Sequence, residues 1–173
     1  MPDMLVKLYA LPPLPPFMDR LRPSSILIRQ AATGEKHIVA DWVRYHFNPR
    51  WAAACEVAVT YDPVSCWIAI RQEPATKPPT QPYDLPAERL IGFACYDVAS
   101  KGMFGPTGVQ ETERGQGVGA ALLVRCLYAM AAQQYAYAII GQAGPTDFYT
   151  KIVGATIIEG SEPGIAHGRL LGL

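Results

Sequence analysis

The chain has 173 residues, of which 50% are hydrophobic and 17% are charged, and its 15 basic residues balance 15 acidic ones. This length and composition predict one globular domain with a hydrophobic core of its own. A formal net charge of zero gives no electrostatic reason to expect a nucleic acid or an anionic membrane as partner. No apolar run approaches a membrane span, and Asp3, Lys7 and nearby prolines argue against a signal peptide, so we expect a cytoplasmic protein.

Four cysteines are spread along the chain without any C-x-x-C spacing: Cys55, Cys66, Cys95 and Cys126. Each lies within an apolar segment, where a thiol behaves as a small hydrophobic side chain. We therefore interpret them as core residues of a protein from a reducing compartment, and we expect no metal site.

Residues 1–24 are predicted to be a proline-rich extension of the domain. The run Leu11–Pro16 (LPPLPP) favours the polyproline conformation and excludes a helix interior or a central strand at that point. Such a segment can dock on an SH3-like partner, or it can pack on its own domain or on a second subunit. Residues 25–173 are expected to form a single domain.

Hydrophobic periodicity predicts the elements of this domain in chain order. Asn48 and Pro49 suit the N-cap and first position of a helix that directly follows another helix. Prolines forbid regular structure in the long connection 73–88. The expected strands are 25–31, 65–71, 90–98, 104–110, 135–141, 155–159 and 166–171, the last two pairing with each other. The expected helices are 36–47, 50–60, 117–132 and 145–153.

Strand 104–110 and strand 135–141 are expected to be parallel neighbours. The nearly continuous apolar run 135–141 is typical of a parallel strand that is buried on both faces. With helix 117–132 between them, the two strands would form a right-handed β-α-β unit. Gly105 and Pro106 predict a bulge or interruption in the first strand, because proline cannot donate to a sheet ladder.

The turn that opens helix 117–132 has the features of a phosphate-binding site. Arg114–Gly119 (RGQGVG) places glycines where the unpaired N–H groups and positive dipole end of the helix lie, next to a permanent charge. It does not fit the P-loop, because no Lys-Ser or Lys-Thr follows the glycines. The dinucleotide fingerprint also fails, since the glycine spacing differs and no acidic residue occurs from 120 to 142.

Two motifs at matching separation resemble those of the GCN5-related N-acetyltransferases. Arg114-x-x-Gly117-x-Gly119, followed by Ala120, resembles the coenzyme A signature of that family. Phe148-Tyr-Thr-Lys-Ile-Val-Gly-Ala155 resembles its F-Y-x-K-x-G-F motif, with one residue inserted and the final Phe replaced by Ala. The resemblance covers roughly residues 25–171, and several segments also look like a bacterial subgroup of unassigned substrate.

The resemblance implies an α/β (α+β) fold with a mixed central sheet of about six to seven strands, flanking helices, and splayed parallel strands 104–110 and 135–141. It implies acetyl-CoA as co-substrate and no metal. The residues expected to bind the coenzyme are Val109, Gln110, Arg114, Gly115, Gln116, Gly117, Val118, Gly119, Ala120, Gly141, Phe148 and Lys151. Gly141 stands where the family often has Asn, and Gly144 where it often has Ala.

The resemblance also implies direct attack of an amine on the thioester. The thioester carbonyl would be polarised by a backbone N–H near Val109, a type of contact for which about 3 kcal/mol is usual. Tyr149 matches the general acid of the family, and a phenol can donate to the thiolate as it forms. The base stays open among Glu111, Glu56 and Glu162, each of which also reads as a solvated surface carboxylate.

Three functions stay open at this point. The first is an acetyl-CoA-dependent N-acetyltransferase acting on a small amine. The second is a non-catalytic acyl-CoA-binding sensor, which the missing Asn and the lack of an obvious base motivate. The third keeps the chemistry but uses a longer acyl-CoA, for which Gly141 and Gly144 would leave room. The sequence does not identify the acceptor, and a homodimer is compatible with the resemblance.

Overall fold

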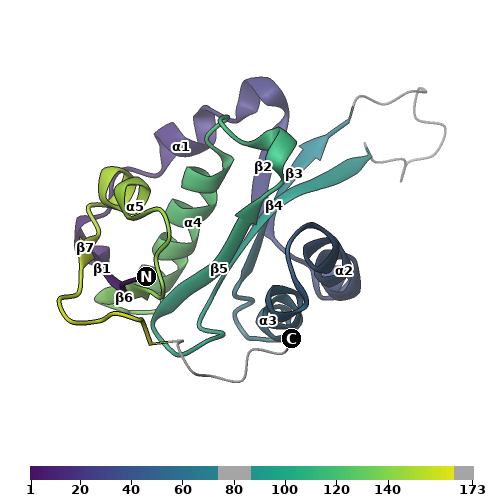
Figure 1. The fold of residues 1–173 in the computed structure, drawn as a ribbon. Helices are drawn as coiled ribbons and strands as arrows, with labels where there is room; N and C mark the ends of the chain where they lie inside the picture. The colour runs from purple at the N-terminus through teal and green to yellow at the C-terminus, as the bar shows by residue number, and fades with distance from the viewer. Residues whose placement is uncertain (74–86, 166–173) are drawn as a thin grey trace.

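A computed structural model describes residues 1–73 and 87–165 of the chain (Figure 1). The strands are β1 (Met4–Lys7), β2 (Ile26–Gln30), β3 (Cys66–Gln72), β4 (Glu88–Tyr96), β5 (Met103–Val109), β6 (Tyr137–Ile140) and β7 (Thr156–Ile157). The α-helices are α1 (Pro15–Asp19), α2 (Lys36–His46), α3 (Pro49–Val59), α4 (Val118–Ala132) and α5 (Thr146–Val153). Short 3-10 turns are η1 (Leu8–Ala10), η2 (Arg22–Ser24), η3 (Thr33–Glu35) and η4 (Glu111–Glu113).

The strands form one mixed sheet in the order β2-β3-β4-β5-β6-β1-β7. Neighbouring strands are antiparallel except β5 and β6, which run parallel on either side of α4 in the sequence. The predicted α/β (α+β) fold and its parallel pair are therefore confirmed. The predicted bulge is confirmed too, because the β4–β5 register shifts between Ala94 and Tyr96, opposite Gly105 and Pro106.

Helices cover both faces of the sheet (Figure 1). One core cluster joins the sheet to α4, with Leu122, Leu123 and Leu127 buried. A second cluster joins the opposite face of β3 and β4 to α2 and α3, through residues such as Val39 and Val43. Helices can pack on the sheet in this way because their buried residues recur every three or four positions, which gives the helix an apolar face. Within the described residues, no helix has the length and hydropathy needed to cross a bilayer.

Strand β1 was not foreseen from the sequence. Its residues Met4–Lys7 lie between β6 and β7 and pair with both, and Met4 and Val6 are fully buried. Part of the proposed extension 1–24 is thus an interior strand of the sheet. The proline run follows it and packs on α4, where the Tyr128 hydroxyl donates to the Pro12 carbonyl at 3.0 Å.

The structure describes one of the two expected C-terminal strands. Thr156–Ile157 pairs with β1, which lies between β6 and β7, and its expected pairing with 166–171 stays a prediction. The second of these strands, 166–171, lies outside the described residues, as does most of the connection 73–88.

Candidate functional site

The turn Arg114–Gly119 at the start of α4, called the α4 turn below, presents backbone N–H donors that no side chain caps. Gly115 and Gly117 have φ values of 82° and 93°, in the left-handed region that favours glycine. Gly117 is the N-cap of α4, and no side chain caps the helix there. The first N–H groups of α4, at the positive end of its dipole, therefore have no capping hydrogen bond from a side chain.

Two arginines flank this turn. Arg114 donates from Nε to the Val109 carbonyl at 3.2 Å, which holds the turn against the end of β5. Arg20 comes from the end of α1 and lies so close to Gly117 that a Cβ added there would be 3.1 Å from its Nε. Arg20 could not be assigned to the turn from the sequence, because no motif connects the two and only the packing of α1 against α4 brings Arg20 there.

The parallel strands β5 and β6 part beside this turn. Their pairing ends at Phe104, although β5 continues to Val109. The Gln110 N–H donates across to a β4 carbonyl at 2.9 Å. Because successive N–H groups in an antiparallel pair alternate in direction, the Val109 N–H points the other way, into the gap. The gap therefore exposes a backbone donor of β5.

One cleft of about 1190 Å³ passes through this gap. On the face that α4 covers, its lining includes Arg20, Arg114 and Leu123. From α3, on the opposite face of the sheet, Trp51 and its neighbours Arg50 and Ala54 also line it. The lining of the cleft therefore includes residues from both faces of the sheet.

Solved structures share this fold. A GCN5-related N-acetyltransferase from Sphaerobacter thermophilus superposes with a TM-score of 0.65 at 18% identity, over 91% of this chain and 48% of that chain. The GCN5-related glucosamine N-acetyltransferase region of a fungal multi-domain GH3 beta-N-acetylglucosaminidase gives 0.68 at 13% identity, over 91% of this chain and 19% of that one. The chain has the GCN5-related N-acetyltransferase fold.

A third structure with this fold is Rv2747 from Mycobacterium tuberculosis in complex with CoA and NLQ, with a TM-score of 0.50 at 17% identity over 79% of this chain and 75% of that one. This chain spans less than half the length of the first two acetyltransferase chains. No protein-family model and no curated protein matches it. At such identities the likeness establishes the fold and not the activity.

Within this acetyltransferase fold, Tyr149 lines the cleft from α5. The residue is only 7% exposed, and burial raises the pKa of Tyr149 above its ordinary value. Its hydroxyl is therefore protonated at neutral pH. Phe148 lines the same cleft and packs against Tyr149 edge to face, with ring centroids 5.2 Å apart. The two residues of the second motif thus share a cleft with the α4 turn.

Most of the other predicted coenzyme-binding residues lie along this cleft. Its lining includes Val109, Arg114, Gly115, Gly117, Val118, Gly119, Ala120 and Gly141. Gly141 does not leave open space, because a Cβ added there would lie 2.3 Å from the Met103 side chain. Gln110 and Lys151 are not among the lining residues, and Lys151 is exposed on α5.

Gln116 braces the turn instead of lining the cleft. Its amide donates to the Glu113 carboxylate at 2.9 Å, and Arg71 and Arg89 donate to the same carboxylate at 2.5 and 2.8 Å. These contacts, led by Arg71, lower the pKa of Glu113 to about 2 despite its burial. Glu113 is therefore a charged anchor that ties β3 and β4 to the α4 turn.

The three candidate bases lie outside the described lining of the cleft. Glu56 accepts from Arg44 at 3.3 Å, and Glu162 pairs with the Met1 amino group at 3.2 Å. Glu111 is exposed in η4. Glu113 does line the cleft, but its low pKa makes it a poor proton acceptor.

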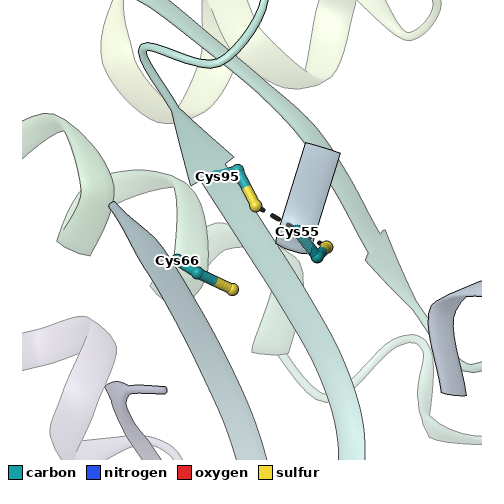
Figure 2. Close-up of side chains that lie close together, drawn as sticks. All are labelled: Cys55, Cys66 and Cys95. Carbon is teal, nitrogen blue, oxygen red and sulfur yellow. Dashed lines mark hydrogen bonds between the residues drawn. The ribbon is translucent and has the colours of Figure 1, made fainter. Parts of the chain in front are cut away.

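In the described part of the chain, one group of side chains has the spacing of a metal site, and none of its members is among the residues that line the cleft. Cys55, Cys66 and Cys95 come from α3, β3 and β4, and their sulfurs lie within 4.8 Å of one another (Figure 2). All four cysteines are buried and free, as the sequence analysis expected.

Proposed function

We propose that this protein is an acetyl-CoA-dependent N-acetyltransferase that acetylates a primary amine of a small acceptor by direct attack. The observation that carries this proposal is the continuity of one cleft. It runs from the uncapped N-terminus of α4, past Val109, to the α3 side of the sheet. Donor and acceptor can then meet at the gap between β5 and β6.

The α4 turn would hold the diphosphate of the coenzyme. Main-chain N–H groups of residues 115–120 supply donors, and Arg114 and Arg20 supply positive charge. The Val109 N–H would donate to the thioester oxygen as it gains negative charge, which is worth about 3 kcal/mol to the transition state. The positive φ values of Gly115 and Gly117 and the lack of a side-chain cap at the start of α4 support this role.

Tyr149 would protonate the leaving thiolate. The amine nitrogen attacks the thioester carbon, the new C–N bond forms, the C–S bond breaks, and the nitrogen releases its extra proton to water in the cleft. The thiolate takes the phenolic proton, and Tyr149 recovers a proton from solvent. Because burial raises its pKa, the phenol is fully protonated at neutral pH before each turnover.

The ammonium proton of the acceptor must leave before attack. Glu111, Glu56 and Glu162 stay proposals for this role, but none lines the described cleft. Glu113 is held ionised by two arginines, so it accepts a proton poorly. This lining supports proton transfer to water in the cleft over transfer to a fixed side chain.

The acceptor end of the cleft favours an amine that also carries an anionic group. Arg50 lines the cleft from α3 beside Trp51 and makes no hydrogen bond or ion pair with another described residue. The acidic residue among the described lining, Glu113, is already paired. A polyamine would find no free carboxylate on these walls, whereas a carboxylate or phosphate would find a guanidinium.

A paired acceptor panel tests this function. Release of free CoA would be followed with 4-aminobutyrate and with butylamine, which differ in the anionic group. We expect faster turnover with 4-aminobutyrate, and Arg50→Ala should reduce that preference by about 10-fold or more, the usual loss of a charge-assisted hydrogen bond. Arg44→Ala is the control, since Arg44 pairs with Asp41 and Glu56 outside the cleft.

A non-catalytic acyl-CoA sensor is the second candidate. The lack of a free carboxylate or histidine on the described lining favours it. Stoichiometric CoA binding without CoA release on any amine of the panel would support the sensor and contradict the acetyltransferase. A longer acyl donor has less support, because Met103 fills the space beside Gly141.

Several sequence-based predictions accompany the proposal and stay predictions. They are the bacterial subgroup of unassigned substrate, the cytoplasmic location, the homodimer, and the lack of a nucleic acid or membrane partner. The proline run, which packs on α4 through Pro12, is compatible with the intramolecular alternative for the N-terminal segment.

A further inference from the structure

Three buried thiols meet between α3 and the sheet. Cys66 and Cys95 are directly opposite each other in the β3–β4 register, so their side chains leave the same face of the sheet. Cys55 points down onto that face from α3, with its sulfur 3.7 Å from that of Cys95 (Figure 2). All three residues are completely buried.

The spacing of the sulfurs matches a three-coordinate metal ion. Sulfurs held about 2.3 Å from one ion in a plane lie about 4.0 Å apart. The three sulfurs already lie within 4.8 Å of one another, so changes of less than about 1 Å in their separations would complete the triangle. Cys126, the fourth cysteine, is equally buried on α4 and does not belong to this group.

The ligands and the environment of the three cysteines indicate which metal ion they would bind. The trio belongs to the apolar core cluster between α2, α3 and the sheet, and no histidine or carboxylate of the described residues joins the three sulfurs. Structural zinc sites require four ligands, whereas soft sulfur ligands also select Cu(I). A monovalent ion is neutralised by a single thiolate, which suits a low-dielectric interior better than a divalent ion with three thiolates.

We propose that Cys55, Cys66 and Cys95 form a binding site for one Cu(I) ion. Binding forms copper–sulfur bonds and releases to solvent a proton from each thiol that binds as thiolate. No electron is transferred. Because no sulfur is exposed, the ion enters through a local opening of α3. The bound ion would fix α3 on the sheet, and α3 also carries Arg50 and Trp51 of the cleft.

The test uses the reduced full chain and Cu(I) presented without oxygen as its coloured bicinchoninate complex. We expect the protein to take one equivalent from the chelator, to melt at a higher temperature when loaded, and to show three sulfur neighbours at about 2.3 Å by X-ray absorption. Copper that stays on the chelator, or fewer than three sulfur neighbours, would overturn the proposal.

Matched serine variants locate the site. Cys66→Ser and Cys55→Ser should lose the bound equivalent, whereas Cys126→Ser should keep it and keep the rise in melting temperature. Equal loss in Cys126→Ser and Cys66→Ser would overturn the three-cysteine assignment. The X-ray absorption result on the unchanged chain decides the matter even if one of these buried substitutions prevents folding.

Discussion

Among single residues, Tyr149 has the most specific predicted role. Its phenol is buried in the cleft and has a raised pKa, so it can donate a proton but does not ionise near neutral pH. Tyr149→Phe should lower kcat by about 100-fold, the usual contribution of general acid catalysis, and leave the Kd for CoA unchanged. Steady-state kinetics and calorimetry measure the two quantities.

The direction of the pH dependence of activity follows from the raised pKa of Tyr149. A raised pKa keeps the acid form present to higher pH, so the decline of activity that reports Tyr149 should lie above pH 10. Tyr128→Phe is the matched control, because Tyr128 donates to Pro12 outside the cleft. Full turnover in Tyr149→Phe would refute the acid role.

Substitution of Arg20 tests whether the N-terminal segment contributes to the proposed coenzyme site. Its guanidinium lies against Gly117 and lines the cleft. Arg20→Glu should weaken CoA binding by about 10- to 100-fold, as expected for loss of a charged hydrogen bond and gain of repulsion. Arg22→Glu, at an exposed residue that pairs with Asp19, should bind CoA normally. Equal affinities for all three proteins would exclude Arg20 from the site.

At the scale of elements, η4 joins two strands to the α4 turn through Glu113. Its carboxylate has a pKa of about 2 in the folded protein and is 8% exposed. A lowered folded pKa means that this stabilisation is complete above the ordinary pKa, near 4.5, and is lost as pH falls towards 2.

Glu113→Gln should therefore lower the free energy of unfolding by about 2 kcal/mol at pH 7, with a smaller difference from the unchanged protein near pH 2. Urea denaturation at both pH values measures this. Glu111→Gln, in the exposed part of η4, is the control. A Glu113→Gln difference that does not shrink in acid would contradict the ionic origin of the stabilisation.

Elements with a strong local pattern could be predicted from the sequence, whereas those defined by distant contacts could not. Helix α4 and the parallel pair β5–β6 follow from a helical stripe, glycines and an apolar run. Strand β1 has only four residues, and its hydrogen-bonding partners β6 and β7 lie more than a hundred residues further along. Its strand character comes from that pairing, which no local pattern reveals.

The same distinction applies to the candidate site. The glycines and Arg114 were found because backbone exposure at a helix start requires them locally. Arg20 and Arg50 were not assigned to the cleft, because their places depend on how α1 and α3 pack. Gln116 was expected in the coenzyme site but turns towards Glu113 and Arg71, whose proximity is a tertiary feature.

At the scale of the whole molecule, the N-terminal segment supplies the strand that joins β7 to the rest of the sheet. Met4 is fully buried between β6 and β7, and the Asp3 carboxylate accepts from the Gln142 N–H at 2.8 Å, next to the cleft. Met4→Ala should lower the free energy of unfolding by about 3 kcal/mol, the usual cost of such a cavity. Lys7→Ala, on the exposed end of the strand, should cost little, and equal losses would contradict the interior position of β1.

The proposed function depends on binding of the coenzyme diphosphate by the α4 turn, and a crystal structure of the protein with CoA tests this most directly. We predict diphosphate oxygens within hydrogen-bonding distance of main-chain N–H groups in residues 115–120, with Arg114 and Arg20 alongside and the thiol arm in the gap between β5 and β6. Diphosphate density elsewhere on the protein, with the α4 turn empty, would contradict the account.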